Sequence, residues 1–520
     1  MTWEPELDEL RRRQELAARM GGEERVERQH ASGRLTVRER IERLFDAGTF
    51  RETGSVAGRG SYDDDGTLTD FLPANTVVGQ GRVDGRRAIV EGDDFTVRGG
   101  SADAAIWEKT VWAERMAHDL RLPLIRLVDG TGGGGSVKTL EMMGFTYVPP
   151  LPGWNIAVEN LSRVPVAAAA LGPVAGLGAA RVVASHFSVI VRETAQMFVA
   201  GPPVVAAAMG EAPDKQELGG WRTQTRAGAI DNDATDEDDA LDQIKRFLSY
   251  LPSSAWEPPP CIDSDDPPHR RDVELLSVVP RDPRKPFKVR ALLEHVLDRG
   301  SVFEMGTGYG RSLVTAFARL GGRPVGVLAS DPRFYGGGLT ADAADKLVRF
   351  VDLCDQFHLP IASFVDQPGF VIGTEAERQG TIRRGTRALW ALYQATVPLA
   401  SVMVRKVFGV AGAGLVDRGH DSVRWAWPSG DWGSLPIAGG LLAAYKRELE
   451  AADDPEALYK EIEERLNAVR SPFRTAERFS VEEIIDPRDT RPLLCDWAER
   501  AHELVRLEAP KGPKARGPRP

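Results

Sequence analysis

Apolar and polar positions alternate along the chain in blocks that predict strands and helices in turn. Four short apolar runs are bounded by Pro, Gly or Asp, as is typical of buried strands. They are RAIVEGDD (87–94), LPLIRLVDG (122–130), PVGVLASD (324–331) and LPIASFVDQ (359–367). Strands of this kind separated by helices indicate βαβ units, so the predicted fold class is α/β.

The segment between the strands of each pair has helical periodicity. Apolar or small residues recur at spacings of three and four, at Ile106, Thr110, Ala113, Ala117 and Leu120, and again at Leu347, Val351 and Cys354. We expect Ser101 and Asp103 to provide the cap and the first-turn acid of the first helix, and Thr340 and Asp342 to do so for the second.

The chain contains an internal repeat. Gly85 and Arg86 recur as Gly322 and Arg323, an offset of 237 positions. The same offset relates five further sites without a gap: Asp94 and Asp331, Gly99–Gly100 and Gly336–Gly337, Lys109 and Lys346, Pro123 and Pro360, Asp129 and Asp366. Agreement over such a length predicts two domains of the same fold.

The offset changes on either side of this stretch. Upstream it is 252, because Asp46 matches Asp298, and the polar stretch SYDDDGTLTDF is the expected insertion in the first half. Downstream it is 233, because Pro165 matches Pro398. This last offset places Gly176, Leu177 and Gly178 on Gly409, Val410 and Ala411.

The repeat and the composition of the connecting segments predict the domain organisation. We expect an N-terminal domain over 1–255, a Pro- and Asp-rich linker over 256–286, a C-terminal domain over 287–508 and a disordered basic tail over 509–520. Residues 1–47 are expected to form charged helical arms.

Composition excludes several classes of function. The 520 residues are 42% apolar with a net charge of −10, which does not suggest a nucleic-acid partner. The three cysteines lie far apart, so we expect neither a disulfide framework nor a zinc site. The N-terminus resembles no signal peptide and no apolar run reaches the ~18 residues of a membrane span, so a cytoplasmic protein is expected.

The sequence supports none of the usual motifs for a phosphate-binding, dinucleotide-binding, serine-hydrolase or metal site. GTGGGGSVKT (130–139) is not a phosphate-binding loop, because Val137 and not Gly precedes Lys138; it is either a turn that lets backbone approach a ligand or a purely structural loop. GTGYG (306–310) lacks the spacing of a dinucleotide fingerprint, and no GxSxG occurs. The histidines are scattered, so no bound metal is predicted.

Backbone amides remain as the candidate chemistry. In GPVAGLGAARVV (172–183) and RKVFGVAGAGLV (405–416), a buried strand passes through glycine into a helix. A helix start leaves N–H groups without partners, and they can stabilise an oxyanion. Close packing of a helix on a sheet also requires Gly and Ala, and this alternative would explain one copy of the pattern. Because the pattern occurs twice, we favour oxyanion binding. The tandem glycines of GGSAD and GGGLTAD could supply a second donor in each half.

From about residue 25 to about residue 505, the chain resembles the carboxyltransferase (beta) subunits of biotin-dependent acyl-CoA carboxylases, of the acetyl-, propionyl- or methylcrotonyl-CoA type. The segments that carry the resemblance are HASGRLTVRERIERLFDAGTF, DDFTVRGGSADAAIWEK, QMFVAGPPVV, ELGGWRTQTRAGAIDNDATDEDDALDQIKRFLSYLP, FVDQPGFVIGTEAERQGTIRRG and TVPLASVMVRKVFG. The resemblance implies two tandem crotonase-like domains, which are ββα superhelices of the ClpP/crotonase superfamily.

The resemblance also implies site residues. Backbone amides of Gly176 and Leu177 would bind the thioester oxygen of acyl-CoA, and those of Val410 and Ala411 the ureido oxygen of biotin. Further acyl-CoA-binding positions would be Gly99, Gly100, Ser101, Gly178 and Ala413, and further biotin-binding positions Gly336, Gly337, Gly338 and Gly409. The carboxyl group of carboxybiotin would then pass to an enolate at the alpha carbon, or the gamma carbon of an unsaturated acyl group.

Partners follow from the same resemblance. This length leaves no room for an ATP-grasp domain and the chain has no biotinylation sequence, so a separate biotin carboxylase and biotin carboxyl carrier (alpha) subunit is expected. The family usually forms rings of six, with active sites between the N-domain of one chain and the C-domain of another.

The sequence departs from the family at several sites. Relatives have Gly-Gly at 176–177 and Gly-Gly-Ala at 409–411, whereas this chain has Leu177 and Val410. GTGGGGSVK replaces Ser-Gly-Gly-Ala-Arg, and LPIAGGLLA (435–443) replaces Met-Gly-Ala-Glu-Gly. Ala413 falls where the family varies a residue that tunes acyl size, which leaves the acyl group open.

Three alternatives remain beside the carboxyltransferase. A biotin-dependent decarboxylase subunit would share the fold. A hydratase or hydrolase of the crotonase type would need carboxylates beside the thioester site, where the sequence suggests only Arg181 and Glu193. A noncatalytic scaffold is compatible with Leu177 and Val410.

Overall fold

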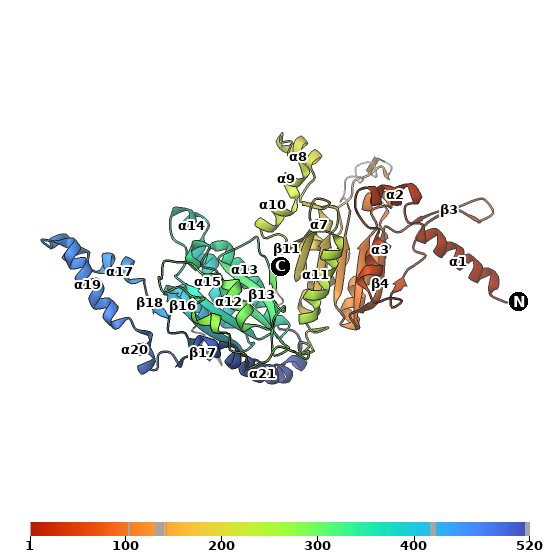
Figure 1. The fold of residues 1–520 in the computed structure, drawn as a ribbon. Coiled ribbons are helices and arrows are strands. Elements are labelled where there is room, and N and C mark those ends of the chain that lie inside the picture. Colours follow the sequence, from red (N-terminus) through yellow and green to blue (C-terminus); the bar gives the residue numbers. More distant parts are fainter. Residues whose placement is uncertain (1, 102–103, 131–139, 142, 417–422, 515–520) are drawn as a thin grey trace. The chain divides into compact units, whose positions relative to one another are not determined.

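The chain folds into two compact units. The computed structural model describes residues 2–101, 104–130, 140–141, 143–416 and 423–514. Unit 1 comprises Met1–Glu257 with Lys511–Pro520, and unit 2 comprises Pro258–Pro510. The elements of both are labelled in Figure 1.

Unit 1 is built on a seven-stranded sheet. The two pairings β1–β4 and β4–β5 are antiparallel, and the strands that follow are parallel. All five residues of the inner strand VAAAA (166–170) are buried, as expected of a parallel strand covered on both faces. In spatial order the strands are β1 (Arg51–Thr53), β4 (Thr76–Val83), β5 (Arg86–Asp93), β6 (Leu124–Val128), β7 (Val166–Ala170), β9 (Phe187–Val191) and β11 (Asn232–Ala234).

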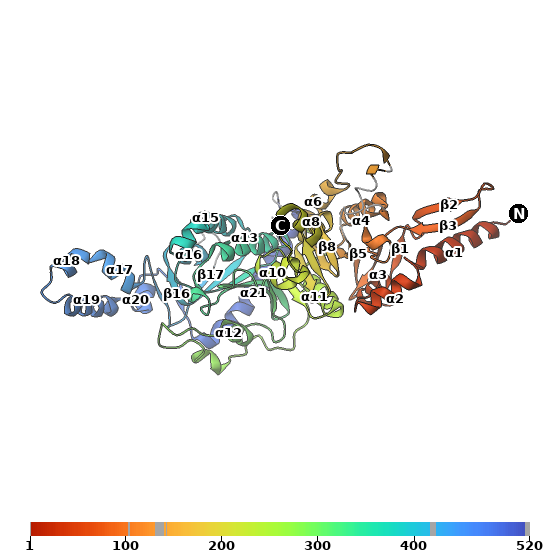
Figure 2. The same ribbon diagram turned by 90° about the horizontal axis from the view of Figure 1, so that it is seen from above.

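Helices cover both faces of this sheet. Helices α3 (Val37–Leu44) and α11 (Glu237–Tyr250) lie on one face, and α4 (Trp107–Leu120) and α6 (Trp154–Arg163) lie on the other, as Figure 2 shows. Each presents an apolar side to the strands, and the rings of Phe187 and Phe247 stack at 5.1 Å between β9 and α11.

Unit 2 repeats this architecture. Helices α13 (Ala341–Gln356) and α15 (Thr381–Gln394) cover one face of its sheet, and α12 (Val289–Val296) and α21 (Thr490–Glu508) the other (Figure 2). The strands in spatial order are β12 (Phe303–Met305), β13 (Leu313–Leu320), β14 (Arg323–Ser330), β15 (Ile361–Gln367), β16 (Leu399–Phe408), β17 (Val423–Ala426) and β19 (Glu483–Ile484).

A side strand is duplicated as well. In unit 2, β18 (Asp431–Gly433) pairs in parallel with the end of β16. In unit 1, β10 (Gln196–Phe198) pairs in parallel with β8 (Pro173–Ala175), which continues the direction of β7. The sequence repeat and the α/β class are therefore both confirmed by the strand order.

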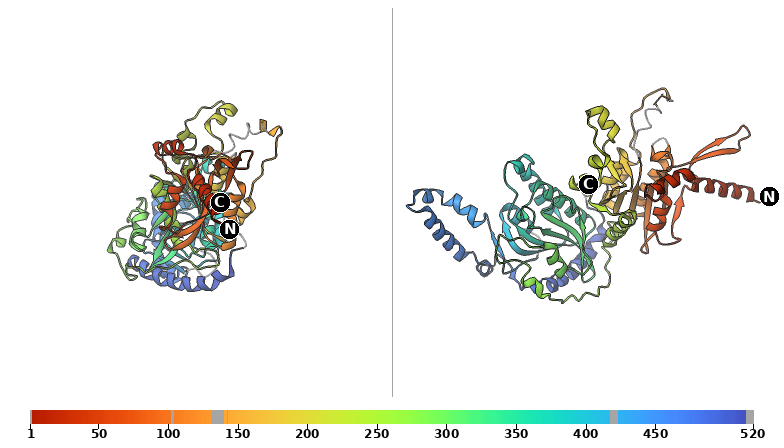
Figure 3. Two further views of the ribbon diagram at one scale, coloured as in Figure 1. Left: turned by 90° about the vertical axis from the view of Figure 1, so that its right-hand side faces the viewer. Right: turned by 45° about the horizontal axis from the view of Figure 1, so that its top comes forward.

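The expected insertion is also confirmed. Residues 58–73 form a hairpin of β2 (Gly58–Tyr62) and β3 (Leu68–Pro73), whereas residues 306–312 connect β12 to β13 in unit 2 without one. Helix α1 (Glu4–Ala18) runs beside β3, and Arg12 donates to the Leu68 carbonyl at 2.9 Å. The hairpin and α1 project from the rest of unit 1, as Figure 3 shows.

One of the two predicted helix caps is wrong. The hydroxyl of Thr340 accepts a hydrogen bond from the Ala343 N–H at 3.0 Å, as predicted for α13. Helix α4 begins only at Trp107, after Ile106, so Ser101 does not cap it. Ser101 instead ends the turn η1 (Arg98–Gly100), and Asp103 lies outside the described residues.

The segment that follows unit 1 contributes to the core of unit 2. It contains the 3₁₀ turn η4 (Val273–Leu276), and Leu275 is buried in that core. Near the C-terminus the turn η7 (Ala509–Lys511) is followed by residues 512–514, and the rest of the predicted tail lies outside the described residues. The other α-helices of the described residues are α2 (Glu23–Ala31), α7 (Leu177–Val183), α8 (Pro202–Met209), α9 (Lys215–Gly219), α10 (Trp221–Arg226), α14 (Thr374–Arg378), α16 (Gly409–Val416), α17 (Ile437–Ala444), α18 (Lys446–Ala451), α19 (Pro455–Val469) and α20 (Pro472–Glu477).

Candidate active site

A glycine of unusual conformation joins strand to helix in each unit. Gly176 follows β8 with φ 59° and ψ −121°, and Gly409 follows β16 with φ 59°. Side-chain-bearing residues rarely adopt such a φ, so glycine is required at both positions. Each glycine turns the chain sharply, and α7 and α16 start there.

The start of α7 supplies amides without helical partners. The first bond of the helix joins the Ala180 N–H to the Gly176 carbonyl at 3.0 Å, so the N–H groups of Leu177, Gly178 and Ala179 precede it. The Gly176 N–H donates to the Phe198 carbonyl at 3.3 Å. This N–H is therefore engaged with β10 in the structure, and its use for an oxyanion stays a prediction.

The start of α16 in unit 2 is similar. Val410 and Ala411 occupy its first turn, where N–H groups have no acceptor within the helix. Ala411 is buried, whereas the Val410 side chain is 59% exposed. Leu177 of unit 1 is half-buried. Leu177 and Val410, the two larger residues, thus both lie in the first turn of a helix.

The tandem-glycine loops adopt the same rare conformation in both units. Three consecutive residues have positive φ in each: Arg98 (54°), Gly99 (64°) and Gly100 (66°), and Tyr335 (50°), Gly336 (62°) and Gly337 (91°). This run bends the backbone tightly after β5 and after β14, so the loops correspond in structure as they do in sequence.

Most of the predicted donors in these loops are already engaged. The N–H groups of Gly100 and Ser101 donate to the carbonyls of Val97 and Arg98, at 3.1 and 3.3 Å. Those of Gly337 and Gly338 donate in the same way to Phe334 and Tyr335, at 2.9 and 3.0 Å. These four amides are therefore used in turn formation in the structure, and a role for the loops in completing the two sites stays a prediction.

Each loop nevertheless lies next to its helix start. In unit 1, a Cβ on Gly100 would lie 2.7 Å from Gly130 Cα, and a Cβ on Gly178 would lie 3.8 Å from the Gly130 carbonyl oxygen. In unit 2, Gly369 lies in the same way between Gly338 and Phe408. The loop, the end of the next strand and the start of the helix therefore meet at one edge of each sheet. The remainder of GTGGGGSVK lies outside the described residues.

A buried aspartate anchors this edge in both units. Asp129 follows β6, and its carboxylate lies 3.0 Å from Arg34 Nη1 and 2.9 Å from Arg40 Nη1. Asp366 of β15 receives two bonds from Arg405, at 3.1 and 2.8 Å. Because buried carboxylates are stable only when paired, each aspartate holds neighbouring segments together at the strand ends.

Carboxylates that the sequence analysis missed lie against α7. Arg181 of this helix lies 2.9 Å from Glu91 and 3.1 Å from Asp93, which both belong to β5. Burial raises the pKa of Glu91, and the charge of Arg181 opposes that rise. A hydratase or hydrolase would need free carboxylates beside the thioester site. The structure brings two acids to this helix, but both are paired with Arg181.

The remaining predicted residues lie beside these helix starts. Gly178 is half-buried and Ala413 is exposed on the second turn of α16. Glu193 is a positive-φ residue between β9 and β10, and its carbonyl accepts from Gln216 at 2.7 Å.

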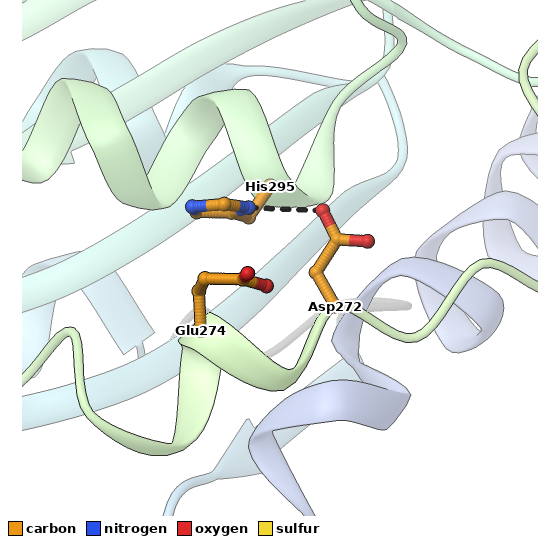
Figure 4. A group of neighbouring side chains, drawn as sticks. All are labelled: Asp272, Glu274 and His295. Atoms are coloured by element: carbon orange, nitrogen blue, oxygen red, sulfur yellow. Dashed lines mark hydrogen bonds and ion pairs between the residues drawn. The ribbon is translucent and has the colours of Figure 1, made fainter.

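One cluster in unit 2 has the composition of a metal site. Among the described residues, Asp272, Glu274 and His295 bring ligand atoms within 4.8 Å of one another (Figure 4). His295 Nδ1 lies 2.9 Å from Asp272 Oδ2, and Arg270 donates to that same oxygen at 2.5 Å. A permanently charged guanidinium in contact with the central ligand opposes a cation, so we assign no metal to this cluster.

A membrane span is not found in the part of the chain that the structure describes, since each helix there is too short or too polar to cross a bilayer.

Comparison with known proteins identifies the family. Residues 28–510 match the carboxyl transferase domain family. The chain is 38% identical to the propionyl-CoA carboxylase carboxyltransferase subunit of Haloferax mediterranei, over 94% of this chain and 95% of that protein. It is 32% identical to the methylmalonyl-CoA decarboxylase subunit alpha of Veillonella parvula, over 94% of both proteins.

A solved structure shows the same fold over the whole chain. The hexameric transcarboxylase 12S with methylmalonyl-CoA and methylmalonic acid bound has a TM-score of 0.85 at 32% identity, with 99% of this chain and 97% of that chain covered. The expectation of two tandem crotonase-like domains is thereby confirmed. The chain belongs to the carboxyl transferase family and is a carboxyltransferase of the biotin-dependent acyl-CoA carboxylase type.

Proposed function

We propose that this chain transfers a carboxyl group from carboxybiotin, carried by a separate subunit, to an acyl-CoA thioester. The observation that carries the proposal is the duplicated glycine-led helix start, at the same edge of the sheet in each unit. Two anionic oxygens must be stabilised in such a transfer, one on the thioester and one on the ureido ring, and the chain provides two equivalent groups of amides.

Unit 1 is assigned to acyl-CoA. The N–H groups of Leu177 and Gly178 would donate to the thioester oxygen as negative charge develops on it. Donors fixed in advance by the fold are worth about 3–4 kcal/mol each to such a transition state. The buried Asp129 and the Gly99–Gly100 loop support this assignment because they fix the strand ends next to the helix.

Unit 2 is assigned to biotin. The N–H groups of Val410 and Ala411 would donate to the ureido oxygen as negative charge develops on it, and α16 carries no acidic side chain that would repel this charge. Carboxybiotin, when bound, supplies the carboxyl group and a ureido nitrogen that can take the substrate proton. The chain then needs no side-chain base of its own, and its amides orient the two reactants and stabilise charge.

Substrate and partners follow from the relatives. The Haloferax protein is named for propionyl-CoA and the transcarboxylase structure contains methylmalonyl-CoA, so a short acyl-CoA such as propionyl-CoA is the first substrate to test. We further propose a biotin-carrying alpha subunit, a hexamer like that of transcarboxylase 12S, and functional domains over 1–255 and 287–508 with a linker between them.

The experiment combines the chain with its native biotin-carrying subunit. Incorporation of labelled bicarbonate into acetyl-, propionyl-, butyryl- and methylcrotonyl-CoA is measured with ATP present. Transfer to at least one thioester is expected. Two of the relatives are decarboxylase subunits, so methylmalonyl-CoA is tested in parallel without ATP. Decarboxylation without carboxylation of any thioester would replace the proposal with the decarboxylase alternative. Absence of both reactions would favour a noncatalytic scaffold.

A further inference from the structure

The two units hold their equivalent helices by different means. In unit 1, α7 is tied to the sheet by charged residues buried beneath it. These charged residues of unit 1 are Glu91, Asp93, Glu114, Arg126 and Arg181. At the equivalent positions of the repeat, and in the same order, unit 2 has Leu328, Ser330, Val351, Ser363 and Gly414. An array of three acids and two bases in unit 1 thus has no ionisable counterpart in unit 2.

The first part of the array fixes the side of α7 that faces the sheet. Arg181 lies 2.9 Å from Glu91 and 3.1 Å from Asp93. The carboxylate of Asp93 also accepts from the Asp129 N–H, at 3.3 Å. Arg181 therefore links the helix to β5 and, through Asp93, to Asp129 after the end of β6.

The second part fixes the far end of the helix. Arg126 of β6 donates to the carbonyls of Arg181 and Ala184, at 3.1 and 2.6 Å. Its other nitrogens bind Glu114 of α4 at 2.9 and 2.6 Å, and Asn160 of α6 donates to Glu114 at 2.8 Å. The guanidinium of Arg126 thus caps the last turn of α7 and is itself held in place by two other helices.

Unit 2 achieves the same placement by close packing. A Cβ on Gly414 would lie 1.8 Å from Leu389 Cδ2, so α16 lies directly against α15. The Ser401 hydroxyl donates to the Leu415 carbonyl at 2.9 Å. Helix α16 therefore needs no charges to be held, whereas α7 is held by the ion pairs of Arg181 and Arg126.

We propose that Arg181 is a positioning residue for the acyl-CoA side of the reaction: through its ion pairs with β5 it sets where the Leu177 and Gly178 amides point. The proposal rests on the proposed function, because it assumes that these amides act on the thioester. A displacement of about 1 Å of such donors can cost about 100-fold in rate, so loss of the array should lower kcat.

The test compares three variants in the complex with the biotin-carrying subunit. Arg181→Met removes the link to β5. Glu91→Gln keeps the shape of that side chain and removes its charge. The triple variant Glu91→Leu, Asp93→Ser and Arg181→Gly installs the residues of unit 2 and leaves no buried charge unpaired. Arg500→Met, in an exposed pair with Asp496, is the control.

The expected result separates positioning from folding. The kcat of carboxylation should fall at least about 10-fold in Arg181→Met and in the triple variant and at least about threefold in Glu91→Gln, with the KM for acyl-CoA within about threefold of the wild type. Amide hydrogen exchange should rise in residues 177–184 and stay unchanged in residues 409–416, a readout that needs no activity. The control should match the wild type in both measurements.

Two outcomes overturn the proposal. One is a wild-type kcat in both Glu91→Gln and the triple variant, whatever the exchange shows. The other is a fall in kcat with unchanged exchange in 177–184. Should Arg181→Met or the triple variant fail to fold, Glu91→Gln alone decides, because its shape is conserved. Absence of carboxylation by the wild type would instead refute the proposed function, and the exchange measurement would still report on the helix.

Discussion

Gly176 and Gly409 have the same φ of 59° at matching positions of the repeat, each between the end of a strand and the start of a helix. Duplicated chains lose sequence identity faster than they lose backbone geometry, since many side chains fit one fold. Here the residues after the glycines have become Leu177 and Val410, yet both helices still begin at that point. The chemistry proposed for these sites depends on main-chain atoms, so such changes are compatible with activity.

Replacement of Leu177 by proline tests the amide in unit 1 directly. Proline is tolerated at the first helical position, where its missing N–H removes no helical bond. Leu177→Pro should therefore keep the fold and delete one donor, which lowers kcat for acyl-CoA carboxylation about 100-fold. Leu177→Ala keeps the N–H and is the control. Equal kcat values for the proline and alanine variants would show that this amide has no role.

The corresponding change in unit 2 is Val410→Pro, with Val410→Ala as its control. If unit 2 receives biotin, the proline variant should impair carboxylation of free biotin from a carboxylated CoA thioester about 100-fold. Binding of acyl-CoA, measured by calorimetry, should be unchanged. Weaker binding of acyl-CoA to Val410→Pro than to Val410→Ala would contradict the assignment of unit 2.

Two adjacent glycines separate backbone strain from steric contact. Gly336 and Gly337 both have positive φ, but a Cβ on Gly336 would meet nothing within 4 Å, whereas a Cβ on Gly337 would lie 2.4 Å from the Asp366 carbonyl oxygen. Gly336→Ala should cost about 1 kcal/mol of the free energy of unfolding, from conformation alone. Gly337→Ala should cost at least about 2 kcal/mol more, because backbone must move. Denaturant unfolding measures both, and equal losses would contradict the close approach.

The buried pair of Asp366 and Arg405 should be important for the stability of unit 2. Asp366→Asn leaves the Arg405 guanidinium buried without its counter-charge, which typically costs about 3–5 kcal/mol. Asp496→Asn breaks the exposed pair with Arg500 and should cost less than about 1 kcal/mol. Denaturant unfolding curves of the two variants test this contrast. A loss in Asp366→Asn no greater than in Asp496→Asn would show that the pair adds nothing to stability.

Much of the fold could be predicted from the sequence, because each half buries the same strands. The runs before Asp94 and Asp331 form β5 and β14, and the offsets predicted that the two halves share one fold; the order of the strands came only from the structure. The cap at Thr340 was correct because its partner is only three residues away. Ser101 failed as a cap because the tandem glycines before it form their own turn, which shifts the helix start to Trp107.

The candidate site could be predicted only in part. The helix starts at Gly176 and Gly409 were found because local sequence determines them. Which amides are free was not predictable: Gly176 donates to Phe198, and Gly100 and Gly337 close their own turns. The ion pair of Glu91 with Arg181 joins residues 90 positions apart, so no local pattern could reveal it. Only the tertiary structure brings these side chains together.

A buried histidine should make the stability of unit 2 depend on pH. His502 of α21 lies 2.9 Å from the Pro324 carbonyl through Nε2. Burial lowers the pKa of His502 to about 4; the bond to Pro324 opposes this shift, and the charges of Arg323, Arg506 and Arg319 add to it. In the unfolded chain the value is near 6.5, so between pH 6.5 and 4 the unfolded state binds more protons. Stability is therefore fully present above about pH 6.5 and is lost as the pH falls toward 4.

The expected size of this loss can be measured. Between pH 7 and pH 5, His502 should account for a decrease of about 2 kcal/mol in the free energy of unfolding. His502→Gln retains an N–H that can donate to Pro324 and cannot be protonated, so its unfolding free energy should change less over this range. His269→Gln, at an exposed position, should behave as the wild type. Denaturant unfolding of all three proteins at both pH values tests the prediction, and the same decrease in His502→Gln as in the wild type would refute it, because the lost stability would then come from other groups.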